Sequence, residues 1–389
     1  MVPAAGIPAS AVVLVFLLFL SGADIFSQHF TAFISYVNRL PKEMQQAKAD
    51  SFLFVNPALP FHDNDTTIVF VAQSTAKNGQ IAGDFTNWKP SVPMTRLAST
   101  DLLYCIKNFE PDARIDYKLV LDDKWMTDPK NPLSCTGGYG TNSELRMPGY
   151  IQPPEVSFDP AIPHGTIKDT VFASGLLKNK RNIKIYLPAG YNLVKQEYPL
   201  VLFHDGIDFV NLGAAANILD RLIVYRQMVP VIAVFIPGVD REEEYAGKQK
   251  DAYCSFICDE LLPYIDSHYA TVRDPHKRAT IGISNGGNIA IYLGMKHPSQ
   301  FGRIGAMSSN FEPVIQSEFQ SGPRLDLEFY LDIGTYDMPE LVTLTTAFLG
   351  ILASRNYGYQ QHTWHEGHSW CNWAAHLSFP LKQFFPYPH

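Results

Sequence analysis

The chain has 389 residues, of which 46% are hydrophobic, 13% aromatic and 18% charged, and its formal net charge is −7. This length exceeds that of a typical domain, so we expect two or three folded units with large apolar cores. The negative charge and the lack of a long basic run exclude the electrostatic footprint of a nucleic-acid-binding protein. Apolar segments recur along the sequence, which excludes extensive disorder.

The N-terminal region has the pattern of a secretory signal peptide. Residues 1–23 contain no charged side chain, and the run Ala11–Leu20 is entirely apolar. Ser21 and Ala23 provide the small residues that a signal peptidase requires at its cleavage site. An apolar run of this length is short for a membrane span. We therefore predict a signal peptide at 1–23 and a secreted, periplasmic or cell-envelope location, with an uncleaved membrane anchor as the alternative.

Three regions of different character follow. Residues 24–60 have a helical pattern that is interrupted or restarted at Pro41. Between residues 61 and 150, short alternating runs such as Ile68–Val71 are separated by turns, which predicts an all-β, immunoglobulin-like sandwich. The proline-rich stretch 151–165 predicts an extended linker.

Residues 166–389 show β-runs that alternate with helical segments. Strand-like runs include Pro199–Phe203, and Val229–Ile236 is almost continuously apolar, as in a strand buried on both faces. Helical periodicity spans Ala252–His268 and Leu341–Ser354. This alternation predicts an α/β domain with a mostly parallel sheet covered by helices.

The cysteines give limited information. Export permits disulfides, but the five cysteines are an odd number, so at least one thiol stays unpaired. Cys105 and Cys135 lie in one predicted domain and could form a bridge. Cys254 and Cys258 lie four residues apart on a predicted helix, where disulfide geometry is poor. They lack the partners that a zinc site needs, and we predict neither a metal nor a cofactor.

The most informative segment is 278–288, where a predicted strand leads into a predicted helix. Ser284 stands at the junction in the pattern Gly-x-Ser-x-Gly, between Gly282 and Gly286. Because glycine has no Cβ, the chain can turn sharply and lift the serine hydroxyl above the carboxyl edge of the sheet. The positive end of the following helix favours negative charge that develops near Ser284. This pattern predicts a nucleophilic serine.

A serine nucleophile needs a base, and the base needs an orienting acid. In this fold class the chain order is serine, acid, histidine, with the partners on loops after later strands. Asp337 follows one predicted strand and His368 follows the last one, so we predict Ser284, Asp337 and His368 as a catalytic triad. Asp332 is the rival acid and His365 the rival base, but both lie within predicted strands. A helix cap is the alternative role for Asp337.

Two backbone N–H groups are candidates for the oxyanion hole. Asn285 directly follows the predicted nucleophile, and the residue at that position donates to the oxyanion in such hydrolases. The second donor comes from a loop after an early strand, and the segment 203–208, Phe-His-Asp-Gly-Ile-Asp, ends such a strand. We assign this role to the N–H of Ile207, with an ordinary Asp-Gly turn as the alternative.

These motifs together resemble a known family. The segments 198–206, 240–245, 256–269, 282–287 and 367–373 are similar to the esterase family that includes enterochelin esterases, esterase D and feruloyl esterases. The resemblance covers roughly residues 165 to 386 and implies an α/β-hydrolase fold with the triad named above. It leaves the substrate open, because the family acts on siderophore, aromatic, acetyl and glutathione thiol esters.

The middle region has a resemblance of its own. The segments 83–88, 94–97 and 117–129 look like family 48 carbohydrate-binding modules, which include the glycogen-binding domain of the AMP-activated protein kinase β subunit. An indole plane can stack on the apolar face of a sugar ring. The resemblance therefore implies a sugar-binding site formed by Trp88, Lys118, Trp125 and Asn142. A structural role for the two tryptophans, in a core or an interface, is the alternative.

The sequence thus predicts a serine esterase that hydrolyses carboxylic esters through an acyl-enzyme. The expected substrate is a small-molecule or glycan-linked ester of the siderophore, feruloyl or acetylated-sugar type, and the sandwich would add polysaccharide binding. One alternative is an acyltransferase that uses the same triad. Another is a glycan-binding envelope protein with an inactive hydrolase domain. The oligomeric state has no readable signal.

Overall fold

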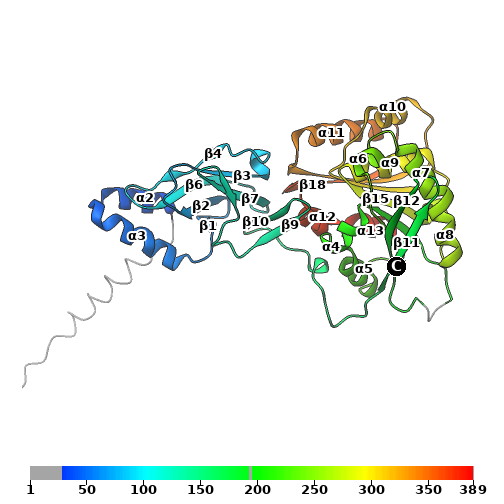
Figure 1. The fold of residues 1–389 in the computed structure, drawn as a ribbon, viewed down its shortest axis with the longest axis horizontal. Helices are drawn as coiled ribbons and strands as arrows, with labels where there is room; N and C mark the ends of the chain where they lie inside the picture. Colours follow the sequence, from blue (N-terminus) through cyan, green and yellow to red (C-terminus); the bar gives the residue numbers. More distant parts are fainter. Residues whose placement is uncertain (1–28, 192–194, 389) are drawn as a thin grey trace, which may run out of the picture. The chain divides into compact units, whose positions relative to one another are not determined.

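The computed structural model of the chain describes residues 29–191 and 195–388. The described residues divide into two compact units, whose elements are labelled in Figure 1. The first unit contains the residues up to Ser134 together with Asn142–Tyr150, and the second contains Cys135–Thr141 and the residues from Ile151 onward. The predicted signal peptide lies outside the described residues. Among the residues that are described, no helix is long and apolar enough to cross a membrane.

Two helices come first among the described residues of the first unit. Helix α2 (Phe30–Arg39) and helix α3 (Lys42–Val55) are separated by Pro41, which stands at the N-cap of α3. Leu40 is extended, with a ψ of 154°, because a proline disfavours helical backbone in the residue before it. The buried side chains of α2 recur at helical spacing and form one inward-facing stripe: Phe30, Phe33 and Val37.

Two β-sheets follow, and their residues belong to the first unit except for Cys135–Thr141 in β9 and the turn into β10, which group with the second unit. One has the strand order β1-β2-β6-β5 and the other has the order β4-β3-β7-β10-β9, with β8 paired to β7. The pairs β2–β6 and β7–β10 are antiparallel. The strands are β1 (Phe61–His62), β2 (Thr67–Gln73), β3 (Gly79–Gly83), β4 (Val92–Pro93), β5 (Thr95–Arg96), β6 (Leu102–Asn108), β7 (Arg114–Leu121), β8 (Lys124–Met126), β9 (Ser134–Gly137) and β10 (Gly140–Arg146).

Strand β2 shows how these layers pack. Successive side chains of a strand point to opposite faces. Phe70 faces the second sheet, where its ring contacts Tyr117 of β7 with 4.8 Å between the centroids. Val69 and Val71 point the other way and share a core with α2 and α3. Both faces of β2 are therefore buried, which explains its run of apolar residues.

An eight-stranded sheet forms the centre of the second unit, in the order β11-β12-β14-β13-β15-β16-β17-β18. Strands β11 and β12 are antiparallel to each other, and β12 is antiparallel to β14. The pairs from β14 to β18 are parallel, so the sheet is mixed. The strands are β11 (Thr166–Ser174), β12 (Asn179–Leu187), β13 (Leu200–His204), β14 (Ile232–Ile236), β15 (Arg278–Ile283), β16 (Arg303–Met307), β17 (Glu328–Tyr336) and β18 (Gly358–Gly367).

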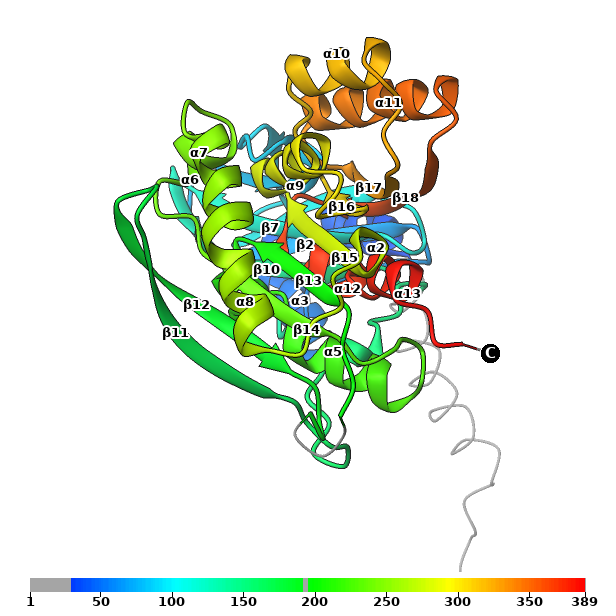
Figure 2. The same ribbon diagram turned by 90° about the vertical axis from the view of Figure 1, so that its right-hand side faces the viewer.

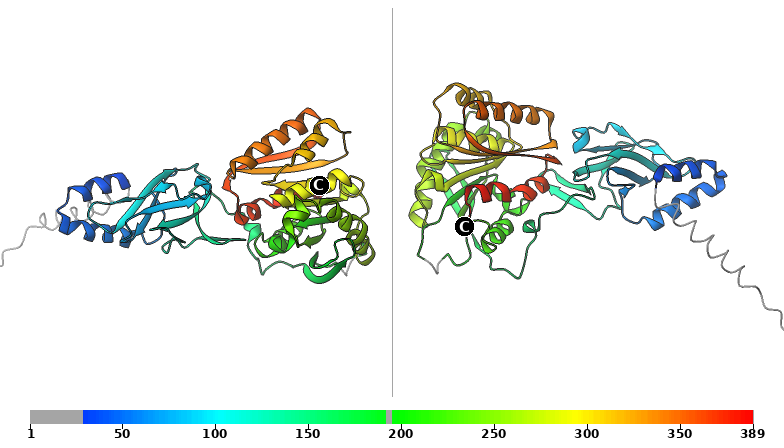
Figure 3. Two further views of the ribbon diagram at one scale, coloured as in Figure 1. Left: turned by 45° about the horizontal axis from the view of Figure 1, so that its top comes forward. Right: turned by 180° about the vertical axis from the view of Figure 1, so that it is seen from behind.

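Helices cover both faces of this sheet. On β13, Leu200 and Leu202 belong to the core under α6 to α11, whereas Val201 and Phe203 belong to the core under α4, α5, α12 and α13. Figure 2 shows α9 on one side of β15 and α12 with α13 on the other. In Figure 3 the orange helix α11 runs beside the orange strand β17, next to the sheet edge that β18 forms. The helices are α4 (Gly206–Asn211), α5 (Ala215–Val224), α6 (Arg241–Tyr245), α7 (Lys250–Ser255), α8 (Leu262–His268), α9 (Asn285–Lys296), α10 (Pro313–Ser321), α11 (Pro339–Ser354), α12 (Trp370–His376) and α13 (Ser378–Phe384).

The disulfide differs from the pair that the sequence suggested. Cys135 is bonded to Cys371, with 6.1 Å between the Cα atoms. The suggested bridge between Cys105 and Cys135 is wrong, because Cys105 is a buried free thiol on β6, in the other sheet of the first unit. The bonded cysteines are 236 residues apart in the sequence, so their spacing carries no signal.

Candidate active site

Ser284 occupies a sharp turn between β15 and α9. Its φ is 52° and its ψ is −125°, a conformation that residues other than glycine rarely adopt. Its N–H donates to the carbonyl of Met307, and its carbonyl accepts from the N–H of Gly287, each at 3.0 Å. A strained residue persists only where its surroundings fix it, and such residues cluster at functional sites.

The glycines on either side of Ser284 are required by the turn. A Cβ atom on Gly282 would collide with the backbone carbonyl of Gly286. A Cβ atom on Gly286 would lie 2.9 Å from a carboxylate oxygen of Asp205. The pattern Gly-x-Ser-x-Gly therefore meets a steric requirement of a strand that turns directly into a helix.

Asp337 and His368 come together because their strands end side by side. Strands β17 and β18 are parallel, and Tyr336 pairs with Gly367 across them. The next residues along the two strands are Asp337 and His368, so the register places both at the carboxyl edge of the sheet. Nδ1 of His368 lies 2.8 Å from Oδ1 of Asp337, with the carboxylate fully buried and the imidazole 22% exposed.

Further contacts hold this pair in place. The N–H of Met338 donates to Oδ1 of Asp337 at 2.7 Å. The ring of Trp373 meets the His368 imidazole at 88°, with 4.7 Å between the centroids. The indole N–H of Trp373 donates to the hydroxyl of Ser308 at 3.0 Å, which fixes the tryptophan in turn. Helix α12 thus supports the imidazole through Trp373.

The other acidic and histidine side chains considered for the site lie within strands. Asp332 is buried within β17, where desolvation raises its pKa to about 7. His204 is hydrogen-bonded to the hydroxyls of Tyr253 and Thr280, and burial lowers its pKa to about 3, so it is neutral near pH 7. His365 lies within β18. Asp337 and His368 instead lie just beyond the ends of β17 and β18, where the acid and the base of a serine nucleophile are expected.

The two predicted oxyanion donors lie in the first turns of two different helices. Ile207 is the second residue of α4, and Asn285 is the first residue of α9. N–H groups in the first turn of a helix have no carbonyl partner within that helix, so they can donate to an anion. Helix α4 starts from Asp205, which has a φ of 58°. A Cβ atom on Gly206 would collide with the backbone of Phe235, so this turn is also tight.

Sequence reasoning missed an ion pair beside these turns. Nε and Nη2 of Arg241 donate to the two carboxylate oxygens of Asp205, each at 2.8 Å. Burial raises the pKa of Asp205, and the guanidinium opposes that shift. The adjacent Glu242 accepts from the side-chain amide of Asn285 at 2.8 Å. Helix α6 is thereby connected to both turns, and no local pattern could have paired residues on separate loops.

The predicted sugar-binding residues lie in the first unit, and two of them have internal partners. The indole N–H of Trp88 donates to Oδ1 of Asp84 at 3.1 Å. The side-chain amide of Asn142 donates to Oδ2 of Asp116 at 3.3 Å. These bonds occupy polar groups that a sugar would otherwise use.

The other two predicted sugar-binding residues, Trp125 and Lys118, have side chains that reach solvent. Trp125 on β8 is 47% exposed and pairs with Val120 of β7. Lys118 is half-buried and lies two residues from Val120, so it shares that face of β7. Trp125 and Lys118 therefore lie on one face of the same sheet.

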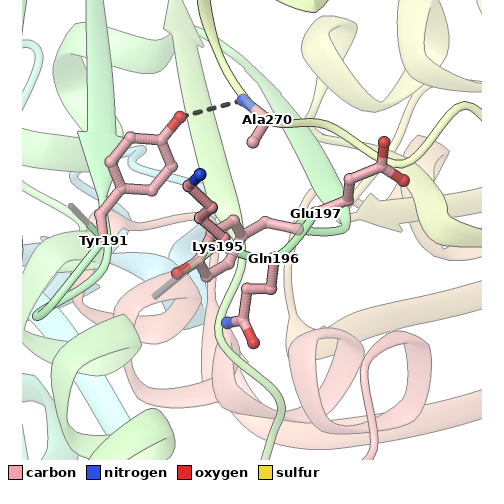
Figure 4. A pocket seen from close by; sticks show the side chains of 6 residues that line it. Tyr191, Lys195, Gln196, Glu197 and Ala270 are labelled. Atoms are coloured by element: carbon pink, nitrogen blue, oxygen red, sulfur yellow. Dashed lines mark hydrogen bonds between the residues drawn. The ribbon is translucent and has the colours of Figure 1, made fainter. Parts of the chain in front are cut away.

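A hollow of about 390 Å³ lies away from this site, near the starts of β13 and β15 (Figure 4). Parallel strands place their starts and ends at opposite edges of a sheet, so this hollow and Ser284 are on opposite edges. It is lined by Tyr191, Lys195, Gln196, Glu197, Tyr198 and Ala270. Within residues 29–191 and 195–388, no group of three or more side chains is arranged to hold a metal ion.

The strand order, the turn at Ser284 and the aspartate–histidine pair define the second unit as an α/β hydrolase.

Comparisons with known proteins place the chain in a family. The family described as "Putative esterase" matches residues 174–384. The iron(III) enterobactin esterase of Escherichia coli O6:H1 is 29% identical over 244 residues, which are 62% of this chain and 60% of that protein. The endo-1,4-beta-xylanase/feruloyl esterase of Xylanibacter ruminicola is 27% identical over 267 residues, which are 65% of this chain and 36% of that protein.

The structural comparison extends over more of the chain. The crystal structure of the enterobactin esterase FES from Shigella flexneri, in the presence of enterobactin, is similar with a TM-score of 0.73 and 21% identity. It covers 86% of this chain and 97% of that one, which shows a shared fold.

The chain belongs to the putative esterase family, whose match extends over more than half of it, and it is a carboxylic ester hydrolase. This confirms the family resemblance that the sequence motifs indicated. The chain spans less than two thirds of the length of the two curated relatives named above.

Proposed function

We propose that the protein hydrolyses carboxylic esters by attack of Ser284, with His368 as the general base and Asp337 as the acid that orients it. The observation that carries this proposal is the 2.8 Å hydrogen bond between His368 Nδ1 and Asp337 Oδ1, at the sheet edge where Ser284 occupies its strained turn. A carboxylate on Nδ1 favours the tautomer with the proton on that nitrogen. Nε2 is then free to accept a proton from the serine.

The chemistry follows from this arrangement. Nε2 of His368 accepts the hydroxyl proton as Ser284 Oγ bonds to the ester carbonyl carbon. The N–H groups of Ile207 and Asn285 stabilise the oxyanion of the tetrahedral intermediate. As the intermediate collapses to an acyl-enzyme, the imidazolium gives its proton to the departing alcohol. His368 then deprotonates a water molecule that attacks the acyl-enzyme, which releases the free acid and restores Ser284.

For the substrate, we propose a neutral ester of a phenolic acid. The relatives are named for iron(III) enterobactin and for feruloyl esters, and both of these molecules carry phenolic rings. The charge of Arg241 is balanced by Asp205, and Asp208 and Glu242 add negative charge near the same turns. Like charges repel a strongly anionic ligand. This balance favours a feruloyl-type ester over a ferric siderophore.

The test compares the wild type with Ser284→Ala on p-nitrophenyl acetate, methyl ferulate, iron-free enterobactin and its ferric complex. We expect the variant to lose roughly a thousandfold or more in kcat on every ester that the wild type hydrolyses. Ser321→Ala is the matched control, because this serine is exposed at the end of α10. A Ser284→Ala variant with wild-type rates would overturn the proposal.

The same assay separates the alternatives for the reaction and the substrate. Release of free ferulic acid indicates hydrolysis, whereas transfer to an added alcohol or sugar indicates an acyltransferase. A higher kcat/KM for methyl ferulate than for ferric enterobactin supports the neutral phenolic ester, and the reverse order contradicts it.

A sugar-binding role for the first unit is a separate proposal. The exposed ring of Trp125 and its neighbour Lys118 on the same sheet face support it. Retention of the whole protein on insoluble starch or xylan tests this role. Trp125→Ala should reduce the retention, because the indole supplies the stacking surface. Equal retention of the variant and the wild type would remove the sugar-binding role.

A further inference from the structure

The disulfide attaches a short segment to the helix that follows the catalytic histidine. Residues 135–141 group with the second unit, and Cys135 is bonded to Cys371 in the first turn of α12. Cys371 is the third residue after His368. The bond therefore fixes this segment, which we call the tip segment, beside the loop that carries the imidazole.

The tip segment also lies close to a side chain that connects the two halves of the site. A Cβ atom on Gly137 would lie 4.0 Å from Cδ1 of Trp370. The Trp370 ring packs against Trp373, which in turn contacts the His368 imidazole. On another side, Trp370 meets Phe209 of α4, with 5.3 Å between the centroids. Helix α4 is the helix whose first turn supplies the Ile207 N–H.

One aromatic ring, that of Tyr139, stands in open space near the end of the tip segment. Tyr139 has a relative exposure of 105%, so its ring is fully available. It stands between Gly138 and Gly140, and a Cβ atom on either glycine would meet no atom within 4 Å. Gly140 has a φ of +104°, which only glycine adopts without strain. The Tyr139 ring is therefore exposed at the end of a short segment, and the Cys135–Cys371 disulfide anchors that segment.

We propose that the tip segment is a specificity element of the esterase site, and that Tyr139 stacks on the phenolic ring of the substrate's acyl group. Tyrosine is suited to this role, since its ring offers a flat apolar face and its hydroxyl a polar partner for a ligand. The Cys135–Cys371 bond anchors the backbone of the tip segment, so less conformational entropy is lost when the acyl group binds than for an unanchored loop. This inference rests on the proposed function, because it assumes a phenolic acyl group attached to Ser284.

The experiment uses two esters with the same leaving group, p-nitrophenyl ferulate and p-nitrophenyl acetate. Tyr139→Ala should lower kcat/KM for the ferulate about threefold to tenfold, mainly through KM, and should leave the acetate within about twofold. Tyr139→Phe keeps the ring and should recover most of the ferulate activity. Tyr225→Ala is the matched control, because this exposed tyrosine follows α5 and precedes β14, at the opposite edge of the sheet.

The disulfide is tested by the paired change Cys135→Ser with Cys371→Ser. We expect it to raise KM for the ferulate more than for the acetate, because the tip segment is no longer fixed. If this variant fails to fold, the single variants of the exposed Tyr139 still decide the question. Equal losses on both esters, or no loss on either, would overturn the role of Tyr139. Full activity of Ser284→Ala would instead overturn the proposed function, whatever Tyr139 does.

Discussion

In the first unit, the guanidinium of Arg114 is buried in β7 with its nitrogens 2.9 Å from Asp116 and 3.1 Å from Glu144. In the second unit, His368 and Asp337 meet on loops just beyond the ends of their strands. The first group is enclosed, and its carboxylates accept hydrogen bonds from Arg114 and, at Glu144, also from Arg146, so its polar atoms serve the fold. The second group keeps a partly exposed imidazole that can exchange a proton. Burial and the completeness of hydrogen bonding therefore separate a structural polar cluster from one available for chemistry.

The largest expected effect is a loss of activity when the aspartate–histidine pair of the second unit is changed. Asp337→Asn should lower kcat about 10³- to 10⁴-fold, because the amide favours the wrong imidazole tautomer while the geometry is kept. Ester hydrolysis under saturating substrate and thermal unfolding are measured on the same preparation. We expect the melting temperature to stay close to that of the wild type. A large loss of stability with little loss of kcat would assign Asp337 a structural role instead.

In the first unit, a change to the buried polar cluster is expected to lower stability. Arg114→Ala leaves the buried Asp116 carboxylate without its cation and Glu144 with Arg146 alone, which should destabilise this unit by about 3–5 kcal/mol. The loss in the free energy of unfolding is measured by denaturant unfolding, with proteolysis of the first unit as the probe. Arg39→Ala removes an exposed arginine of α2 and serves as the control. If Arg114→Ala unfolds at the same denaturant concentration as this control, the buried cluster contributes nothing to stability.

A smaller effect, on the pH dependence of stability, is expected from Asp332, which is buried in β17, the strand that leads to Asp337. Its pKa is raised from 3.8 to about 7 by desolvation, so the folded state binds the proton more tightly than the unfolded state. The associated stability is complete below the unfolded pKa and is lost as pH rises through the folded value. Each pKa unit corresponds to about 1.4 kcal/mol, so the loss between pH 4 and pH 8 is roughly 4 kcal/mol at most.

Asp332→Asn removes this titration with little change in shape. The melting temperature of the wild type, measured relative to that of the variant, should therefore fall as pH rises from 4 to 8. A difference that is constant over this range would contradict the raised pKa.

Local steric rules explain which parts of the site could be predicted. The turn at Ser284 was readable because Gly282 is required by a close backbone approach to Gly286 within the same short segment. Asp337 and His368 were readable because each directly follows a strand, and neighbouring parallel strands end at one edge. The family match confirms the resemblance that these segments indicated.

Long-range pairings could not be predicted in this way. Cys135 and Cys371 are 236 residues apart, and the sequence suggested a nearer partner for Cys135 that lies in a different sheet. The bidentate pair of Arg241 with Asp205 joins two loops whose approach depends on the packing of the whole sheet. In the first unit, the internal hydrogen bond of Asn142 likewise depends on strand register. Such contacts follow from tertiary structure and leave no local pattern.

The central claim is that Ser284 is the nucleophile, and covalent labelling tests it most directly. The protein is treated with a fluorophosphonate, which reacts with activated serines, and the modified residue is located by tandem mass spectrometry. We predict one modification, on Ser284, that is absent in Ser284→Ala and slowed in Asp337→Asn. Hydrolysis that continues while Ser284 stays unlabelled, or a label on another serine, would contradict the account.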